Sequence, residues 1–299
     1  MPKYSELDIA GMKVKVSNLN KVFYPETGFT KQQMIDYYIR ISPVLLPHLA
    51  GRPLTLKRYP NGVEKNFFYQ KSCPSSRPEW MTTTPIWSES NNRETCYCIV
   101  DSLQALVWVA NLAGLELHTS LSKQEDSKIP TMMVFDLDPG LPATIIECAK
   151  VALYLNELFM NANLKSYPKT SGSKGLQVYV PLNTPTDYNQ TKELAYKVAQ
   201  TLEAKYSNLV ISKMNKKQRE GKVFIDWSQN DEHKTTVCVY SLRAKEKPTV
   251  STPVTWEEVE EAYKSKDSKQ LFFTFDNILK RVDQIGDLFA PVLTTKQYL

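Results

Sequence analysis

Two aspartates lie two positions apart at the end of an apolar segment. Asp136 and Asp138 follow the run Met-Met-Val-Phe at 132–135 and precede Pro139. Side chains alternate along a strand, so the two carboxylates would project from one face about 7 Å apart, with Leu137 directed into the core. Carboxylates at that separation repel each other unless a cation lies between them, and their hard oxygens suit Mg²⁺ or Mn²⁺. Taken alone, the pair is explained more simply by a solvated turn that begins before Pro139.

A third acid favours a metal site over a turn. Asp226 ends a second apolar segment at 223–225. Three acids at the ends of core strands can hold two divalent ions about 4 Å apart, which stabilise the attacking and leaving oxygens when a nucleotidyl group is transferred. We therefore predict that Asp136, Asp138 and Asp226 are catalytic and bind two Mg²⁺ or Mn²⁺ ions. Asp101 is a weaker candidate, because it precedes an expected helix and is interpreted as the N-cap of that helix.

A loop rich in glycine and serine could bind phosphate. The segment TSGSKG at 170–175 combines two glycines, the hydroxyls of Ser171 and Ser173, and the amine of Lys174. Glycines let backbone N–H groups approach an anion, and the lysine adds positive charge. A strand rather than a helix is expected after this loop, so the segment is not a Walker A motif. Phosphate binding and a simple turn are equally good interpretations of this segment alone.

Cations and aromatic residues elsewhere could complete a nucleotide site. Arg243 ends an expected strand and could bind a triphosphate, although an exposed arginine needs no ligand. His118 is expected to end a helix, where a histidine commonly serves as a cap. Lys57 with Phe68 and Tyr69 has the composition of a surface that stacks bases and follows a nucleic-acid backbone. Aromatic residues at strand spacing also line protein cores, so this cluster is weak evidence by itself.

The elements that must position these residues mix strands and helices without a regular βαβ repeat. We therefore predict an α+β fold with mixed or antiparallel sheets flanked by helices, rather than a doubly wound fold. No internal repeat or flexible linker interrupts the chain, so a single domain covering 1–299 is expected. Strands are expected at 12–16, 54–59, 132–138, 176–182, 223–227 and 235–242. Helices are expected from Thr30 to Pro43 and at 102–117, 142–160, 189–205, 255–264 and 275–282.

Composition bounds the class of protein. The 299 residues are 42% hydrophobic and 23% charged, which is ordinary for a globular protein and argues against wholesale disorder. The formal net charge of +5 permits a polyanionic partner without requiring one. No segment approaches the roughly 18 apolar residues of a membrane helix, and we expect no secretory signal. The five cysteines, at 73, 96, 98, 148 and 238, are interpreted as reduced thiols of a cytoplasmic protein without a membrane partner.

Six motifs in order make the chain resemble the polymerase domain of ligase D, the primase-like enzyme of bacterial and archaeal non-homologous end joining, in the archaeo-eukaryotic primase superfamily. The motifs are VSNLNKVFYP (16–25), GRPLTLKR (51–58), FDLDPG (135–140), TSGSKG (170–175), VFIDWSQN (223–230) and YSLR (240–243). The resemblance covers about residues 11–290. It implies a primase-polymerase-like fold, with an N-terminal part at about 11–70 that binds DNA and its 5′-phosphate, and a catalytic core at about 95–250.

The resemblance also implies a role for each matching residue. The residues that match the catalytic metal ligands are Asp136, Asp138 and Asp226. The residues that match the nucleotide-binding groups are Lys57, Phe68, Tyr69, His118, Ser171, Lys174, Gln229 and Arg243. The residues that match the groups binding the 5′-phosphate of a downstream strand are Asn18, Lys21 and Lys31. In one departure, Gln177 stands where relatives usually carry histidine; glutamine can donate a hydrogen bond but cannot carry a proton's charge at neutral pH.

The activity implied by the resemblance is DNA-directed nucleotidyl transfer in the repair of double-strand breaks. A primer 3′-hydroxyl would attack the α-phosphate of an NTP or dNTP, in primer extension and gap filling. The family typically favours ribonucleotides and Mn²⁺, and it implies gapped or broken DNA, a Ku protein and a DNA ligase as partners, and a nucleoid-associated location in the cytoplasm. The chain is then either a free-standing polymerase or a domain of a longer protein.

Two alternatives to gap filling stay open. The chain could be a primase that starts strands without a primer, or a non-catalytic module that bridges DNA ends. The second alternative fits poorly with Asp136, Asp138 and Asp226, because three acids in the groove of a pure polyanion binder would weaken its affinity.

Overall fold

The chain folds into two compact units, of which the computed structural model describes residues 4–88 and 92–299. Unit 1 comprises Met1–Glu125, Thr235–Val250 and Thr274–Gly286. Unit 2 comprises Asp126–Lys234, Ser251–Phe273 and Asp287–Leu299. The boundaries at 125/126 and 234/235 fall inside the catalytic core expected at about 95–250, so that core contains parts of both units. That the two units act as one catalytic domain stays a prediction.

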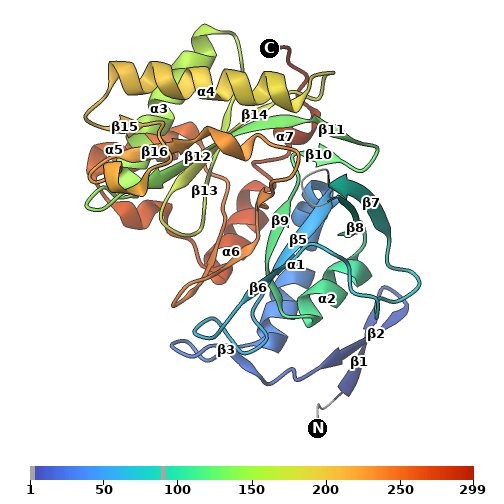
Figure 1. The fold of residues 1–299 in the computed structure, drawn as a ribbon. Helices are drawn as coiled ribbons and strands as arrows, with labels where there is room; N and C mark the ends of the chain where they lie inside the picture. The colour runs from blue at the N-terminus through green and yellow to red at the C-terminus, as the bar shows by residue number, and fades with distance from the viewer. Residues whose placement is uncertain (1–3, 89–91) are drawn as a thin grey trace. The chain divides into compact units, whose positions relative to one another are not determined.

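Unit 1 is built on an antiparallel sheet with the strand order β17-β9-β5-β8-β7, and β6 also pairs with β5. These strands are β5 (Pro53–Arg58), β6 (Phe68–Gln70), β7 (Thr83–Ser88), β8 (Arg93–Ile99), β9 (Gly114–Thr119) and β17 (Thr236–Val237). The helices of this unit are α1 (Lys31–Leu49), α2 (Leu103–Asn111) and α6 (Phe275–Ile285) (Figure 1). Its small hairpins pair β1 (Tyr4–Ile9) with β2 (Met12–Ser17), β3 (Val22–Tyr24) with β4 (Phe29–Thr30), and β18 (Leu242–Ala244) with β19 (Pro248–Val250).

Helix α1 begins where the sequence predicts. Thr30 is its N-cap, and the Thr30 hydroxyl accepts a hydrogen bond from the backbone N–H of Gln33 while the Gln33 side chain accepts one from the Thr30 N–H. This reciprocal capping satisfies two backbone donors that a helix start leaves free. The helix continues past Pro43 to Leu49, further than expected. The Tyr38 hydroxyl donates to the carbonyl oxygen of Leu115 at 2.7 Å, which fixes α1 against β9.

Unit 2 is built on a five-stranded mixed sheet with the order β13-β14-β12-β16-β15. The strands are β12 (Met132–Pro139), β13 (Tyr167–Thr170), β14 (Leu176–Pro181), β15 (Val210–Ile211) and β16 (Val223–Asp226). Only the β15–β16 pair in this sheet is parallel. The helices are α3 (Ile145–Asn161), α4 (Tyr188–Lys205), α5 (Trp256–Ser265) and α7 (Pro291–Thr294), with short 3₁₀ turns at Lys216–Gln218, Trp227–Gln229 and Ser268–Leu271. Two short strands, β10 (Ser122–Lys123) and β11 (Asp126–Pro130), complete the described elements of the chain.

The sheet of unit 2 separates an apolar face from a polar one. Phe135 and Leu137 of β12 are fully buried in a core to which α3, α4 and α5 contribute. Asp136 and Asp138 alternate with them and therefore lie on the other face. The predicted strand at 132–138 and the inward direction of Leu137 are thus confirmed. The predicted α+β class with mixed and antiparallel sheets is confirmed as well.

The helix expected at 102–117 ends early. Helix α2 stops at Asn111, and the next residues turn into β9, so His118 lies in a strand and not at a helix end. Ala113 adopts a left-handed backbone with φ 63°, and a β-carbon on Gly114 would lie 2.6 Å from the carbonyl oxygen of Val109. The apolar spacing at 102–117 also fits one continuous helix, so the sequence did not reveal this turn. Asp101 is also not the N-cap, since the Ser102 side chain accepts the capping hydrogen bond.

The last predicted strand and the cysteines also differ from expectation. Within 235–242, β17 covers only Thr236–Val237, and the chain then turns: the Ser241 N–H donates to the Cys238 carbonyl oxygen, and Tyr240 has a positive φ of 64°. Cys73 and Cys98 form a disulfide, with their Cα atoms 5.0 Å apart, so the prediction of reduced thiols is wrong for this pair. Their 25-residue separation carries no pairing signal, and the fold brings them together.

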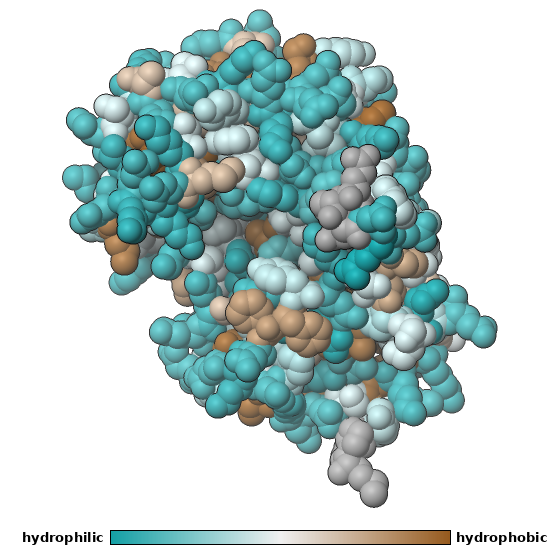
Figure 2. Space-filling view, viewed as in Figure 1, coloured by the Kyte–Doolittle hydropathy of each residue, from teal (hydrophilic) through white to brown (hydrophobic). Residues whose placement is uncertain are grey.

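The surface visible in Figure 2 is mostly hydrophilic, with hydrophobic side chains in small separate patches. In the part of the chain that the structure describes, no helix combines the length and the apolar character needed to cross a membrane.

Candidate active site

The three predicted acids lie on one face of the unit 2 sheet. Asp136 on β12 is the register partner of Asp226 on β16, and Asp138 lies two residues further along β12. Opposed residues on antiparallel strands share a face, with Cβ atoms about 5 Å apart. The pKa of Asp136 is raised to about 7, first by burial and then by the negative charge of Asp138, against a hydrogen bond from Gln177, with a further upward effect from Asp226. Burial and the charge of Asp138 thus both disfavour the ionised form of Asp136.

Asp226 is oriented by the turn that follows it. Its Oδ1 accepts hydrogen bonds from the backbone N–H of Ser228 at 3.1 Å and from the Ser228 hydroxyl at 2.5 Å. Its Oδ2 accepts from Gln229 Nε2 at 2.9 Å. The Ser228 oxygen is in turn contacted by Lys234 Nζ at 2.6 Å. The structure therefore places Gln229, expected in the nucleotide pocket, directly on one of the acids.

The chemistry of this donor set fits a divalent cation. Carboxylate oxygens are the ligands that Mg²⁺ and Mn²⁺ prefer, and a cation would relieve the carboxylate repulsion that adds to the effect of burial on the pKa of Asp136. Within residues 4–88 and 92–299, no three acidic, histidine or cysteine side chains already converge as a set of metal ligands. The side chains of Asp136, Asp138 and Asp226 would therefore have to turn toward a bound ion.

The predicted phosphate loop is a tight turn between β13 and β14. The Ser171 hydroxyl accepts hydrogen bonds from the backbone N–H groups of Ser173 and Gly175, both at 3.2 Å. Ser171 is buried, whereas Lys174 is exposed. A β-carbon on Gly175 would lie 1.9 Å from the carbonyl oxygen of Leu137. The loop thus packs on the backbone between Asp136 and Asp138, which a residue with a side chain at 175 would prevent.

Unit 1 gathers three of the predicted nucleotide-binding residues around a buried carboxylate. Glu116 on β9 is only 2% exposed. Its Oε1 lies 3.7 Å from Lys57 Nζ, and its Oε2 lies 3.0 Å from His118 Nε2 and 3.3 Å from Arg243 Nε. Its Oε1 also accepts a hydrogen bond from the backbone N–H of Ala244 at 3.0 Å. Glu116 therefore ties β5, β9 and β18 together.

The charges of this cluster depend on one another. Burial raises the pKa of Glu116, but the hydrogen bond from His118 and the charges of Arg243 and Lys57 outweigh it and lower the pKa to about 2. Burial lowers the pKa of His118, and the nearby positive charges of Arg243 and Lys57 lower it further, against the raising effect of Glu116. Glu116 was missed in the sequence because 102–117 was interpreted as a helix; in a strand, its spacing of two from His118 places both on one face.

The aromatic residues beside this cluster divide between two faces. Tyr69 and Phe68 are register partners of Lys57 and Arg58, so they point to opposite sides of the sheet. Lys57 Nζ lies 5.7 Å from the Tyr69 ring centroid and 4.1 Å from that of Phe67. The Arg58 guanidinium instead lies 5.0 Å from the Phe68 ring. The structure thus brings Tyr69, together with Phe67, to the side of Lys57 and His118, and Phe68 to the other side.

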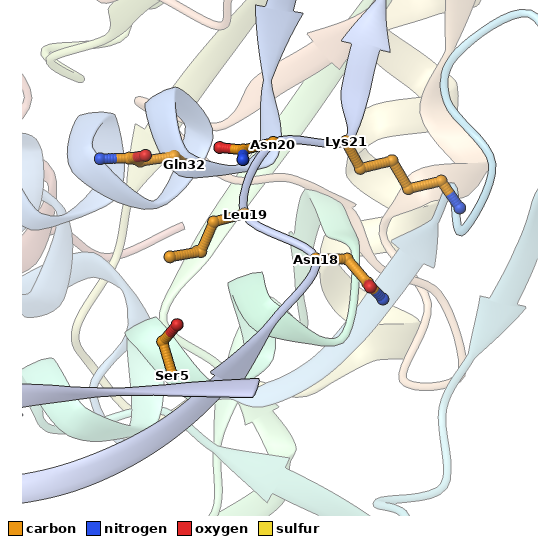
Figure 3. Close-up of a pocket in the computed structure, with 6 residues that line it drawn as sticks. All are labelled: Ser5, Asn18, Leu19, Asn20, Lys21 and Gln32. Atoms are coloured by element: carbon orange, nitrogen blue, oxygen red, sulfur yellow. The ribbon is translucent and has the colours of Figure 1, made fainter. Parts of the chain in front are cut away.

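Two of the residues expected to bind a 5′-phosphate line a pocket in unit 1. A cavity of about 550 Å³ is lined by Ser5, Asn18, Leu19, Asn20, Lys21 and Gln32. Figure 3 shows the loop at 18–21 between Ser5 on β1 and Gln32 on α1. Lys21 Nζ donates to Asn61 Oδ1 at 2.8 Å. Two of the three predicted residues, Asn18 and Lys21, therefore line one cavity.

Lys31 does not line this pocket. It is 4% exposed, and its Nζ donates to the carbonyl oxygen of Ser17 and to Asn111 Oδ1, both at 2.6 Å. Burial, followed by the positive charges of Lys21 and Arg58, lowers the pKa of Lys31 to about 8. Lys31 therefore supports the backbone that leads into Asn18.

Comparison with known proteins gives one consistent result. A family model described as the LigD primase-polymerase domain matches residues 30–289. The multifunctional non-homologous end joining protein LigD of Mycolicibacterium smegmatis is 43% identical over 282 residues, which is 94% of this chain and 36% of that protein. The bifunctional LigD of Bacillus subtilis is 30% identical over 275 residues, 92% of this chain and 43% of that protein. The chain thus spans less than half the length of these relatives.

A solved structure agrees with the sequence relatives. The polymerase domain from Mycobacterium tuberculosis ligase D, in complex with DNA, matches with a TM-score of 0.87 and 39% sequence identity. The match covers 95% of this chain and 99% of that one. The primase-polymerase-like fold predicted from the six motifs is therefore confirmed.

Proposed function

Because this chain belongs to the family of LigD primase-polymerase domains, we propose that it is a DNA-directed nucleotidyltransferase that extends primers and fills gaps in the non-homologous end joining of DNA double-strand breaks. The observation that supports the chemistry is the set of three acids on one sheet face, with Asp136 opposite Asp226. The observation that supports the substrate is the DNA bound to the related polymerase domain from Mycobacterium tuberculosis.

In the proposed reaction, a primer 3′-hydroxyl attacks the α-phosphate of an incoming nucleotide and pyrophosphate leaves. Asp136, Asp138 and Asp226 would hold two divalent ions, Mn²⁺ or Mg²⁺. Bound there, such ions favour deprotonation of the hydroxyl and neutralise the charge of the leaving group. Ser228 and Gln229 orient Asp226 through their hydrogen bonds to its two oxygens.

Each unit offers groups suited to a nucleotide. In unit 2, the exposed Lys174 beside the Ser171 turn would bind phosphate. In unit 1, Arg243, Lys57 and His118 are held by Glu116 and would bind the anionic part of the nucleotide. Tyr69 would offer its exposed ring to the base of the nucleotide, whereas Phe68, which the sequence also suggested, lies over Arg58 on the other face of the sheet.

The pocket at Asn18 and Lys21 would bind the 5′-phosphate of a downstream strand. Lys31 would hold the backbone before Asn18 through its hydrogen bond to the Ser17 carbonyl oxygen. The proposal includes gapped or broken DNA, a Ku protein and a DNA ligase as partners, a preference for ribonucleotides, and a nucleoid-associated location in the cytoplasm. These parts rest on the family, whose relatives are named as end-joining proteins.

The test is primer extension on a gapped duplex with Mn²⁺, comparing NTPs with dNTPs. Asp136→Ala should slow extension at least about a thousandfold, because a metal site contributes several kcal/mol to the transition state, while DNA binding persists. Glu193→Ala is the matched control, since it removes an exposed acid of the same unit that pairs with Lys197. Extension by Asp136→Ala at the wild-type rate would overturn the proposal.

The same assay separates the alternatives. Synthesis on single-stranded template without a primer would indicate a primase. DNA-end bridging by a wild-type protein that extends no primer would indicate a non-catalytic module.

A further inference from the structure

Four polar side chains form a row across the face of the unit 2 sheet that bears the acids. Lys169 on β13 is the register partner of Gln177 on β14, Gln177 is the partner of Asp136 on β12, and Asp136 is the partner of Asp226 on β16. Directly opposed residues share a face. The row therefore runs from a lysine, through an amide, to two of the predicted metal ligands.

The lysine at the end of this row is buried. Lys169 is 1% exposed, and its Nζ donates hydrogen bonds to Gln177 Oε1 and, at 2.7 Å, to Ser251 Oγ. The Ser251 hydroxyl donates to the carbonyl oxygen of Thr170 at 2.9 Å, which leaves its oxygen to accept from the lysine. The ammonium also lies 5.4 Å from the centroid of the Tyr179 ring. These contacts fix the position of the lysine.

The contacts of Lys169 determine the direction of the Gln177 amide. An ammonium group can only donate hydrogen bonds, so the amide oxygen must face it. The amide nitrogen then faces Asp136, to which the Gln177 side chain is hydrogen-bonded. A flipped amide would place N–H groups against the ammonium and an oxygen against the carboxylate, which is repulsive at both ends. Gln177 is 2% exposed, so bulk water offers little compensation for the loss of either contact.

We propose that Lys169 is a positioning residue, which acts through Gln177 to fix the orientation of the Asp136 carboxylate for a divalent cation. The proposal rests on the function proposed above, since it assumes that Asp136 is a metal ligand. It assigns Gln177 to the metal site. The partners that orient a metal ligand in this way commonly change metal affinity about 10- to 100-fold when removed.

The first test is the affinity for Mn²⁺, measured by calorimetry on the full chain without DNA or nucleotide. Lys169→Met keeps the apolar stem and removes the donor, and we expect Mn²⁺ binding to weaken about tenfold or more. Gln177→Met should have a similar effect. Lys264→Met is the matched control, because it removes an exposed positive charge of the same unit that pairs with Glu260 on α5. Thermal unfolding checks that every variant folds.

The double variant decides how Lys169 acts. If it acts through Gln177, Lys169→Met with Gln177→Met should weaken Mn²⁺ binding no more than either single change. If the lysine charge acts on Asp136 directly, the losses of Mn²⁺ affinity in the two single variants should add in the double variant. Lys169 would then not act through Gln177. Wild-type Mn²⁺ affinity in a folded Lys169→Met variant would also overturn it.

Gln177→His provides the rescue. A neutral imidazole offers one acceptor nitrogen and one N–H donor, so it can accept from Lys169 and donate to Asp136 as the amide does. We expect Gln177→His to bind Mn²⁺ more tightly than Gln177→Met. If both variants weaken Mn²⁺ binding equally, residue 177 does not act by accepting from Lys169 and donating to Asp136. If these tests fail while Asp136→Ala is inactive in primer extension, only the positioning role of Lys169 is rejected. If Asp136→Ala extends primers as the wild type does, the proposed function is rejected.

Discussion

Glu116 and His118 stand two residues apart on β9, and His118 Nε2 lies 3.0 Å from Glu116 Oε2. The same carboxylate lies 3.3 Å from Arg243 Nε and 3.7 Å from Lys57 Nζ. Three groups proposed to bind the nucleotide are thus held by one buried acid. A buried charge with this many partners contributes stability only while it is ionised.

This arrangement predicts a pH dependence of the stability. The pKa of Glu116 is lowered from 4.5 to about 2 in the folded protein. A lowered carboxyl pKa stabilises the fold above the unfolded pKa, and that stability is lost as the pH falls toward the folded pKa. The advantage of the wild type over Glu116→Gln in free energy of unfolding should therefore shrink by about 2 kcal/mol between about pH 5 and about pH 3.

Urea unfolding of both proteins across this pH range measures the difference. Glu260→Gln is a control, because Glu260 is exposed and pairs with Lys264 on α5. A difference between wild type and Glu116→Gln that stays constant with pH would contradict the coupling.

The acids were predictable because their evidence is local. The alternation of Asp136, Leu137 and Asp138 depends only on strand geometry, and the structure bears it out. Glu116 was not predictable from the same kind of pattern, because the apolar spacing at 102–117 fits a helix and the turn at Ala113 depends on a close backbone approach to Val109. Local hydrophobic periodicity cannot distinguish a buried helix from a helix followed by a buried strand.

Contacts between strands were outside what the sequence could predict. Gln177 faces Lys169 and Asp136 only because β14 lies between β13 and β12 in one particular register. That register is set by the whole buried face of the sheet. The same holds for the disulfide between Cys73 and Cys98, whose partners the spacing of five cysteines does not identify.

Position 175 should tolerate no side chain because it packs closely on β12, and not because of its backbone conformation. A β-carbon there would lie 1.9 Å from the Leu137 carbonyl oxygen, so Gly175→Ala must push the loop away from β12. We expect a loss of about 3 kcal/mol or more in the free energy of unfolding, as for severe overpacking, and slower primer extension. Gly28→Ala is the control: Gly28 has φ 67° and no atom near its β-carbon position, so it should lose only about 1 kcal/mol. Equal losses in both variants would contradict the packing argument.

Tyr69 and Phe68 should differ in their effect on nucleotide binding. Tyr69 lies on the side of Lys57 and His118, with its ring 6.1 Å from that of His118, whereas Phe68 lies over Arg58. Stacking on a base is worth about 1–3 kcal/mol, so Tyr69→Ala should raise the KM for the nucleotide about tenfold. Phe68→Ala should leave that KM within about twofold and serves as the matched control. Steady-state extension at varied NTP checks this, and a larger effect of Phe68→Ala would reverse the assignment.

Lys21 should set the response to a 5′-phosphate. It lines the pocket with Asn18, and its amine is held by Asn61 at 2.8 Å. Lys21→Ala should remove most of the stimulation by a 5′-phosphate on the downstream strand and reduce the slope of log affinity against log salt by about 1.

The measurement is binding and extension on gapped duplexes that carry either a 5′-phosphate or a 5′-hydroxyl. Lys13→Ala is the matched control, because Lys13 is an exposed lysine of the same unit that faces Glu6 outside the pocket. It should retain the full difference between the two substrates. If Lys21→Ala also retains it, the pocket at 18–21 does not recognise the phosphate. If both variants lose affinity equally on both substrates, unit 1 contributes only a general attraction to DNA.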